Sequence, residues 1–193
     1  YQFNTRMKLN DQNIEIVPKM KILGTTITEN FSWDENCSSI IKKVNARMQL
    51  LQKVWSFGSS FEEMVHLWKV YCLSILEQSC VVWGGSLTAE NVNDLERTQK
   101  TFCKLVMEED FKNYHHALNV LGLTTLEIRR RKLTLDFAKR SLSDNKFRDL
   151  FPTRKTAHTM NTRNREQYKV NHANTNRYYN SAIPTMQRLL NEN

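Results

Sequence analysis

The segment SFEEMVHLWKVYCLSILEQSCVVW, residues 60–83, is the most informative part of this chain about its architecture. Its large apolar side chains fall on nearly every side of a helix with 3.6 residues per turn, so the helix must be packed by neighbours on several sides. Ser60-Phe61-Glu62-Glu63 has the order of a capping box, which predicts the beginning of the helix. Trp83-Gly84-Gly85 predicts its end. We therefore expect a central helix that is surrounded by other helices.

Amphipathic helices are predicted on both sides of this central segment. Ser32-Trp33-Asp34-Glu35 is a second capping-box sequence, and the helix that follows it should have one apolar face up to Gly58. Thr88 is the predicted cap of a helix that extends to about Val106. These two helices would supply the neighbours that the central helix requires.

The next part of the chain predicts one short and one long helix. A helical turn near residues 115–121 should end at Gly122, a residue suited to a left-handed cap. Thr124-Thr125-Leu126-Glu127 is a third capping-box sequence and predicts a helix to about Leu142. A last turn should stop at Pro152.

The first 28 residues predict strands. Residues 10–13 (NDQN) form a turn cluster, and apolar residues alternate with polar ones at Ile14 and Ile16 and again at Met20 and Ile22. Gly24 interrupts the last strand, where the backbone must bend or approach something closely. Two or three short strands are not stable alone. We therefore expect further chain before Tyr1 that completes the sheet.

Composition narrows the fold class. The chain has 193 residues, of which 40% are hydrophobic, and only 5 Gly and 3 Pro, which argues against a turn-rich β-sandwich or a Gly-rich nucleotide-binding fold. No apolar run approaches the roughly 18 residues of a membrane span. Residues 153–176 are polar and are expected to be linker or disorder, and residues 183–190 to form a terminal strand or short helix. The prediction is a mainly α protein: a helical bundle preceded by a small β-strand fragment and followed by a basic polar tail.

The sequence holds no recognisable catalytic motif. It has no phosphate-binding glycine loop, no nucleophile elbow and no HExxH pair. The four cysteines, Cys37, Cys72, Cys80 and Cys103, lack the spacing of zinc ligands, so a metal-dependent enzyme is disfavoured. Cys72 and Cys80 fall within an apolar helical pattern and are predicted to be core thiols, which fits a reducing intracellular compartment.

Positive charge gathers on two of the predicted helices. The formal net charge is +8, which favours polyanionic partners. On the helix after Trp33, Lys43 and Arg47 flank the apolar stripe, and Lys42 and Lys53 lie opposite it. On the helix after Leu126, a basic band interrupted by Asp136 is the predicted exposed strip; its members are Arg129, Lys132, Lys139 and Arg140. Such residues can neutralise phosphates, or they can form an ordinary solvated face with ion pairs.

Six groups of residues stand in a suggestive order: Lys21-Ile22-Leu23-Gly24 with Thr26-Ile27 and Trp33; Tyr71, Ile75 and residues 76–83 (LEQSCVVW); residues 94–100 (DLERTQK); Ala117-Leu118, Leu121-Gly122-Leu123, Leu126 and Arg129-Arg130; Phe151-Pro152; and Arg177-Tyr178, residues 181–184 (SAIP) and 187–191 (QRLLN). Together they resemble the region downstream of the catalytic motifs in reverse transcriptases of non-LTR retrotransposons, the LINE-type elements of the jockey/CR1 kind. The resemblance covers nearly the whole chain. Ile22 departs from it by replacing an aromatic residue, and Asn36 by standing where a histidine is common.

The resemblance implies an organisation and a function. Residues 1–28 would be the end of a palm, residues 29–85 a helical thumb, residues 86–152 a C-terminal extension and residues 153–193 a tail. The paired catalytic aspartates of the family are not in this sequence and would lie upstream of Tyr1, together with the Mg²⁺ that they bind, so no cofactor is expected on this chain.

The same resemblance implies an RNA/DNA primer–template duplex and the remaining fingers and palm as partners, with an intracellular location, nuclear or cytoplasmic. The strand with Lys21 and Gly24 would be a primer grip, in which the glycine permits close backbone approach. Lys42, Lys43, Arg47 and Lys53 would contact duplex phosphates, with the second basic band as a further surface. The alternative is a small helical interaction module without a nucleic-acid role, which would present an apolar face near Trp55 and Phe57.

Overall fold

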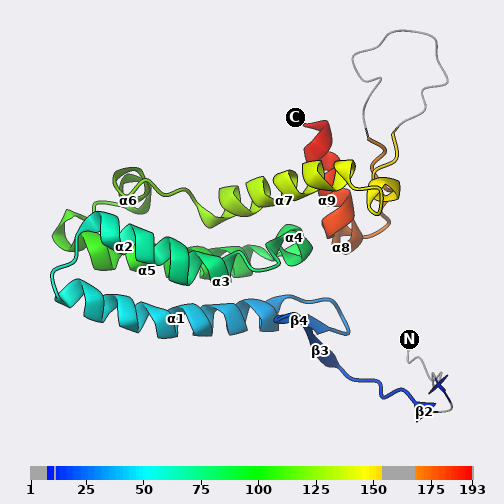
Figure 1. Ribbon diagram of the computed structural model, residues 1–193, viewed down its shortest axis with the longest axis horizontal. Helices are drawn as coiled ribbons and strands as arrows, with labels where there is room; N and C mark the ends of the chain where they lie inside the picture. Colours follow the sequence, from blue (N-terminus) through cyan, green and yellow to red (C-terminus); the bar gives the residue numbers. More distant parts are fainter. Residues whose placement is uncertain (1–7, 11, 154–167, 193) are drawn as a thin grey trace, which may run out of the picture.

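The computed structural model describes residues 8–10, 12–153 and 168–192. It confirms the predicted fold class, since helices make up most of the described chain and two small pairs of strands precede them (Figure 1). Within these ranges no helix combines the length and apolar composition that crossing a membrane requires. Predictions that fall on residues 1–7 and 154–167 lie outside the described residues.

Two antiparallel hairpins form the N-terminal part. β1 (Lys8–Leu9) pairs with β2 (Gln12–Asn13), and β3 (Lys19–Ile22) pairs with β4 (Thr25–Thr28). The second hairpin turns at Leu23 and Gly24, whose φ angles are +47° and +89°, as a tight two-residue turn requires. The predicted strand at Ile14 and Ile16 is wrong, because this segment has no strand partner among the described residues and leads into Pro18.

The helix α1 (Asp34–Ser56) begins differently from its prediction. The capping box at Ser32 is wrong: Trp33 occupies the N-cap position and its side chain makes no capping bond. The Ser32 hydroxyl instead donates to the Asp34 carboxylate at 2.5 Å. Glu35 is drawn away to an ion pair with Lys19 at 2.9 Å, and so it does not reach back to the backbone. Side chains from β3 and from the first turn therefore outcompete the local motif.

The central helix begins as predicted but is not continuous. The Ser60 hydroxyl accepts from the Glu63 N–H, and the Glu63 carboxylate accepts from the Ser60 N–H at 2.8 Å, so this capping box is confirmed. The helix is divided into α2 (Phe61–Leu67), the π-helical η1 (Trp68–Leu73), α3 (Ser74–Leu76) and α4 (Cys80–Trp83). Ser79 has a φ of +54°, which ends the run before α4. The Trp83 indole donates to the Gln78 carbonyl at 3.0 Å and holds this break.

The helices α5 (Ala89–Met107), α6 (Tyr114–Val120) and α7 (Leu126–Ser143) complete the bundle. Thr88 caps α5 as predicted, and Gly122 is left-handed with a φ of +59°. The capping box at Thr124 is wrong by one residue, because Thr125 caps α7 and the Glu127 N–H donates to Glu96 at 2.9 Å. Three single turns, η2 (Gly84–Ser86), η3 (Glu108–Asp110) and η4 (Arg148–Leu150), connect these helices.

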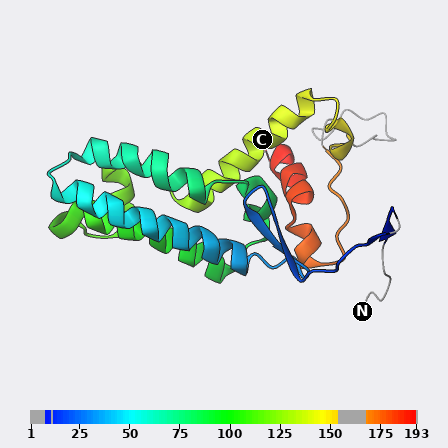
Figure 2. The same cartoon turned by 60° about the horizontal axis from the view of Figure 1, so that its bottom comes forward.

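The C-terminal segment packs back onto the molecule. α8 (Asn176–Tyr179) leads into α9 (Ala182–Asn191), which lies beside α7 (Figure 2). A short helix was one of the two forms predicted there. Residues 168–171, predicted to be linker or disorder, are an ordered irregular segment, since the N–H groups of Tyr168 and Asn171 each donate to α9 side chains at 2.8 Å.

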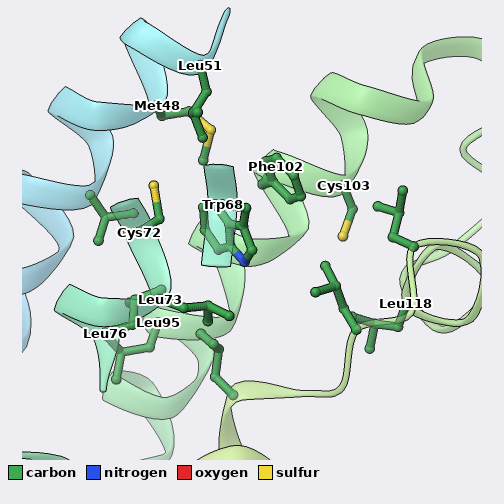
Figure 3. Close-up of a cluster of buried hydrophobic side chains, with 14 of the residues drawn as sticks. Met48, Leu51, Trp68, Cys72, Leu73, Leu76, Leu95, Phe102, Cys103 and Leu118 are labelled. Atoms are coloured by element: carbon green, nitrogen blue, oxygen red, sulfur yellow. The ribbon is translucent and has the colours of Figure 1, made fainter. Parts of the chain in front are cut away.

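The main core lies between α1, η1 and α5. Trp68 and Phe102 are fully buried and stack with ring centroids 4.5 Å apart (Figure 3). The core takes side chains from Trp33 through Leu126, that is, from both sides of the predicted boundary at residues 85/86; the division into domains stays a prediction. Buried free thiols belong to this core as predicted; burial raises the pKa of Cys72 and Cys80 to about 11 and of Cys37 and Cys103 to about 12.

Candidate nucleic-acid interface

The outer side of α1 carries exposed lysines. Lys42 and Lys53 lie opposite the buried stripe that includes Val44, Met48 and Leu51, and Lys43 lies at the edge of that stripe; all three lysines are exposed. None of the three lysines forms an ion pair with a residue in the described part of the chain. Lys53 lies in the last turn, where a positive charge also complements the helix dipole. Their charges are therefore available to an external anion.

A groove between α1 and α5 adjoins these lysines but has mixed charge. Its volume is about 560 Å³, and it is lined by Lys42 and Arg97 as well as by Asp34, Glu90 and Asp94. Hydrogen bonds from Ser32, and then from Asn91 at 2.7 Å, lower the pKa of Asp34, so this carboxylate is ionised at neutral pH. Carboxylates repel phosphates, and the groove floor is therefore unsuited to a polyanion.

Arg47 differs from the lysines because the protein already uses it. Its Nη1 donates to the Tyr71 carbonyl at 3.0 Å, and its guanidinium lies 5.8 Å from the centre of the Tyr71 ring. Tyr71 is in the π-helical segment, where the wider turn alters the backbone hydrogen bonding. The side chain remains exposed, so a contact to phosphate would compete with the contact to Tyr71.

The second predicted surface, on α7, is only partly exposed. Arg129 forms an ion pair with Glu77 of the segment before α4. Lys132, Lys139 and Arg140 are exposed, and the Arg140 Nε donates to the carbonyl of Asp136 at 3.3 Å.

The prediction that the basic band is the exposed strip of α7 is wrong. Ile128 is 57% exposed and Phe137 is 37% exposed, so apolar side chains share the outer face with the cations. The helix extends beyond the bundle and is covered there only in part, by α9 and the turn before Phe151 (Figure 2).

The predicted primer-grip residues lie on the β3–β4 hairpin. Lys21 is exposed and pairs in register with Thr26. The close approach at Gly24 is made within the chain: a Cβ there would lie 2.7 Å from the Gln78 Nε2, which donates to the Leu23 carbonyl at 3.1 Å. The hairpin is further tied to α1 by the Thr26 N–H, which donates to Asn36 at 3.1 Å.

The predicted cations do not form one continuous surface. α1 packs on α5 and η1, whereas α7 packs on α4, α5 and α9, and Figure 1 shows α1 and α7 on opposite sides of the helices between them. Sequence reasoning also missed a structural feature of α7: Arg130 is buried, although it stands between two other arginines. Helical periodicity turns Arg130 100° away from each neighbour, which was the available signal.

Comparison of the chain with protein-family models, with curated proteins and with solved structures found no match.

Proposed function

We propose that this chain serves in a non-LTR retrotransposon reverse transcriptase as the part that grips the primer–template duplex. The observation that carries the proposal is the row of exposed lysines on α1, free of ion pairs to described residues, directly after a hairpin whose outer strand β3 is exposed. The proposal rests also on the sequence resemblance, which implies the end of a palm, a helical thumb and a C-terminal extension in that order.

The proposed mechanism is positioning rather than bond making. Lys42, Lys43 and Lys53 neutralise duplex phosphates and release condensed counterions, which gives affinity without sequence preference. Lys21 on β3 adds a contact near the primer end. The metal-dependent chemistry of chain extension is assigned to palm residues outside this sequence.

A salt titration with a short RNA–DNA hybrid tests this role. The variant Lys42→Gln/Lys43→Gln/Lys53→Gln should bind the hybrid more weakly. The negative slope of log affinity against log salt should become shallower, by roughly 0.9 for each phosphate that is no longer neutralised. Fluorescence anisotropy at several salt concentrations measures both quantities.

The matched control is Lys100→Gln/Lys112→Gln/Lys146→Gln, which removes the same charge from exposed positions outside the proposed surface. It should leave the slope near that of the unmodified protein. Equal slopes for the two triple variants would mean that binding follows net charge alone, and the α1 interface would be abandoned.

One observation favours the second candidate, a helical interaction module. Phe57 is 86% exposed, and a hollow of about 250 Å³ along the last turns of α1 is lined mainly by apolar side chains that include Leu50 and Val54. Trp55 itself is half-buried, stacks on Phe61 and donates to Glu108 at 2.6 Å, so it does not present a free face. A protein that failed to bind the hybrid at low salt would favour this reading.

A further inference from the structure

A cavity lined by residues of η2, α5, α7 and α9 has no part in the proposed function. Its volume is about 260 Å³, below the roughly 300–1,000 Å³ of pockets that hold drug-sized ligands. Three arginines line it, Arg130, Arg131 and Arg188, against a single carboxylate, Glu127. The hydroxyl-bearing residues Thr134 and Thr185 are also in its wall. Size and charge both suit a small anion.

Arg130 is the buried cation in the wall of this cavity. The side chain belongs to a residue only 4% exposed, and its Nη1 has no hydrogen-bond partner within the described residues. A buried guanidinium nitrogen without a hydrogen bond is costly, because its desolvation is not offset. The nearby carboxylate of Glu96 attracts Arg130, and its two oxygens accept hydrogen bonds from the Tyr114 hydroxyl at 2.6 Å and from the Glu127 N–H at 2.9 Å.

The backbone around the cavity is shaped for close approach. A Cβ at Gly84 would lie 3.4 Å from the Arg130 Cδ, and a Cβ at Gly85 would lie 2.8 Å from the Asn180 carbonyl oxygen. The Ser86 hydroxyl donates a hydrogen bond to the same Asn180 carbonyl at 2.7 Å. The two glycines thus let the segment before α9 close over Arg130, and any larger residue at Gly85 would force this wall of the cavity apart.

The other two arginines are held at the wall by contacts of their own. Arg131 pairs with Glu192, and Arg188 donates to the Tyr179 carbonyl at 2.5 Å while it lies over the Tyr179 ring at 3.8 Å. These contacts fix the positions of the two positive charges, and planar guanidinium groups with several donors are suited to phosphate oxygens.

We propose that this cavity binds a phosphate group, with Arg130 as the buried anchor and Arg131 and Arg188 at the wall. Phosphate oxygens are suitable acceptors for the guanidinium groups that line the cavity. The proposal does not depend on the role of α1, which lies on the other side of the bundle. The phosphate can belong to free inorganic phosphate or to the end of a nucleic-acid strand.

Isothermal titration calorimetry of the full chain with inorganic phosphate, at constant ionic strength in chloride, tests the site. The unmodified protein should bind phosphate, and Arg130→Gln should lose about tenfold or more in affinity because one charge-assisted contact is removed. The control Lys100→Gln removes a positive charge from exposed α5 and should bind as the unmodified protein does. The proposal would be overturned if neither inorganic phosphate nor a 5′-phosphorylated oligonucleotide bound, or if Arg130→Gln bound as tightly as the unmodified protein.

Arg131→Gln provides a second test in case Arg130→Gln does not fold, because Arg131 is exposed and its replacement should leave the fold intact. It should fold and bind phosphate several-fold more weakly, and unchanged affinity would overturn the proposal. A five-nucleotide DNA with and without a 5′-phosphate identifies the source. Binding that requires the 5′-phosphate and Arg131 points to a strand end, whereas binding of inorganic phosphate alone points to the free ion; both support the site. Neither result depends on the α1 lysines, so the two proposals can fail separately.

Discussion

α1 and α7 both carry several cations, but the lysines of α1 and the first three arginines of α7 differ in their contacts within the protein. On α1 the lysines face outward, and the helix is held by an apolar stripe that packs on α5 and η1. On α7 three consecutive arginines are paired or buried within the protein. Arg129 forms an ion pair with Glu77, Arg130 is buried, and Arg131 forms an ion pair with Glu192. α1 is anchored mainly by apolar burial, whereas α7 buries Leu126 and Ala138 and is also attached by the ion pairs of Arg129 and Arg131.

The chemistry of the two side chains explains the difference. A lysine ammonium is compact and strongly hydrated, so it stays in water, whereas a guanidinium is weakly hydrated and has five donors that can bind several partners. Positive charge in the sequence is therefore not equivalent to positive charge that a nucleic acid can reach. Within this chain the lysines of α1 are the better candidates for an external contact.

The largest expected effect tests how α1 is anchored. Leu51 is 3% exposed and lies in the core, so Leu51→Ala should lower the free energy of unfolding by about 2–5 kcal/mol. Its neighbour Leu50 is 60% exposed, and Leu50→Ala should cost far less. Urea denaturation of both variants measures the difference. Similar losses would contradict the view that the apolar stripe holds α1.

A smaller effect is expected for the ion pair that anchors α7. The side chains of Arg129 and Glu77 are 34% and 19% exposed, between the surface and buried classes of ion pair. A double-mutant cycle with Arg129→Gln and Glu77→Gln should give a coupling of about 1–2 kcal/mol in the free energy of unfolding.

The exposed pair Arg97–Asp94 is the reference for that cycle, since its side chains are 73% and 36% exposed. Its coupling should be about 0.3 kcal/mol, as for other pairs three or four residues apart on a helix. If the two couplings were equal, Arg129 would be no more than a surface cation, and the contrast between α1 and α7 would weaken.

The sequence predicted the features that depend on neighbouring residues. The capping box at Ser60, the cap at Thr88 and the left-handed Gly122 are local, and all three are confirmed. Where a partner from another element intervenes, the prediction was wrong. At Ser32 the side chains of Asp34 and Lys19 redirect the expected bonds.

The interruption of the central helix also depends on distant contacts. The π-helical η1 brings Trp68 under Phe102 of α5, and the break at Ser79 is held by Trp83. A periodic pattern shows only which faces are apolar, and it does not show where a turn widens to fit a ring from another helix.

The candidate site was likewise predictable only where it depends on local sequence. Exposure of Lys42, Lys43 and Lys53 follows from helical periodicity alone. The partner of Arg129 is 52 residues away in the chain. The cavity around Arg130 includes residues of α9, and no local sequence motif predicts that α9 packs there. Sequence reasoning thus located charge correctly on the helices, and the tertiary structure decided which charges remain free.

The smallest expected effect is the sharpest test of that last distinction. If the lysines of α1 have no structural task, the variant Lys42→Gln/Lys43→Gln/Lys53→Gln should unfold at the same urea concentration, and with the same slope, as the unmodified protein. Arg129→Gln/Arg131→Gln removes one charge fewer, yet it breaks two ion pairs and should unfold at lower urea. A shift for the lysine variant as large as that for the arginine variant would mean that α1 also relies on its cations, and weakened binding to a hybrid could then be caused by altered folding. An unchanged midpoint makes any loss of binding a property of the surface, because the fold beneath it is the same.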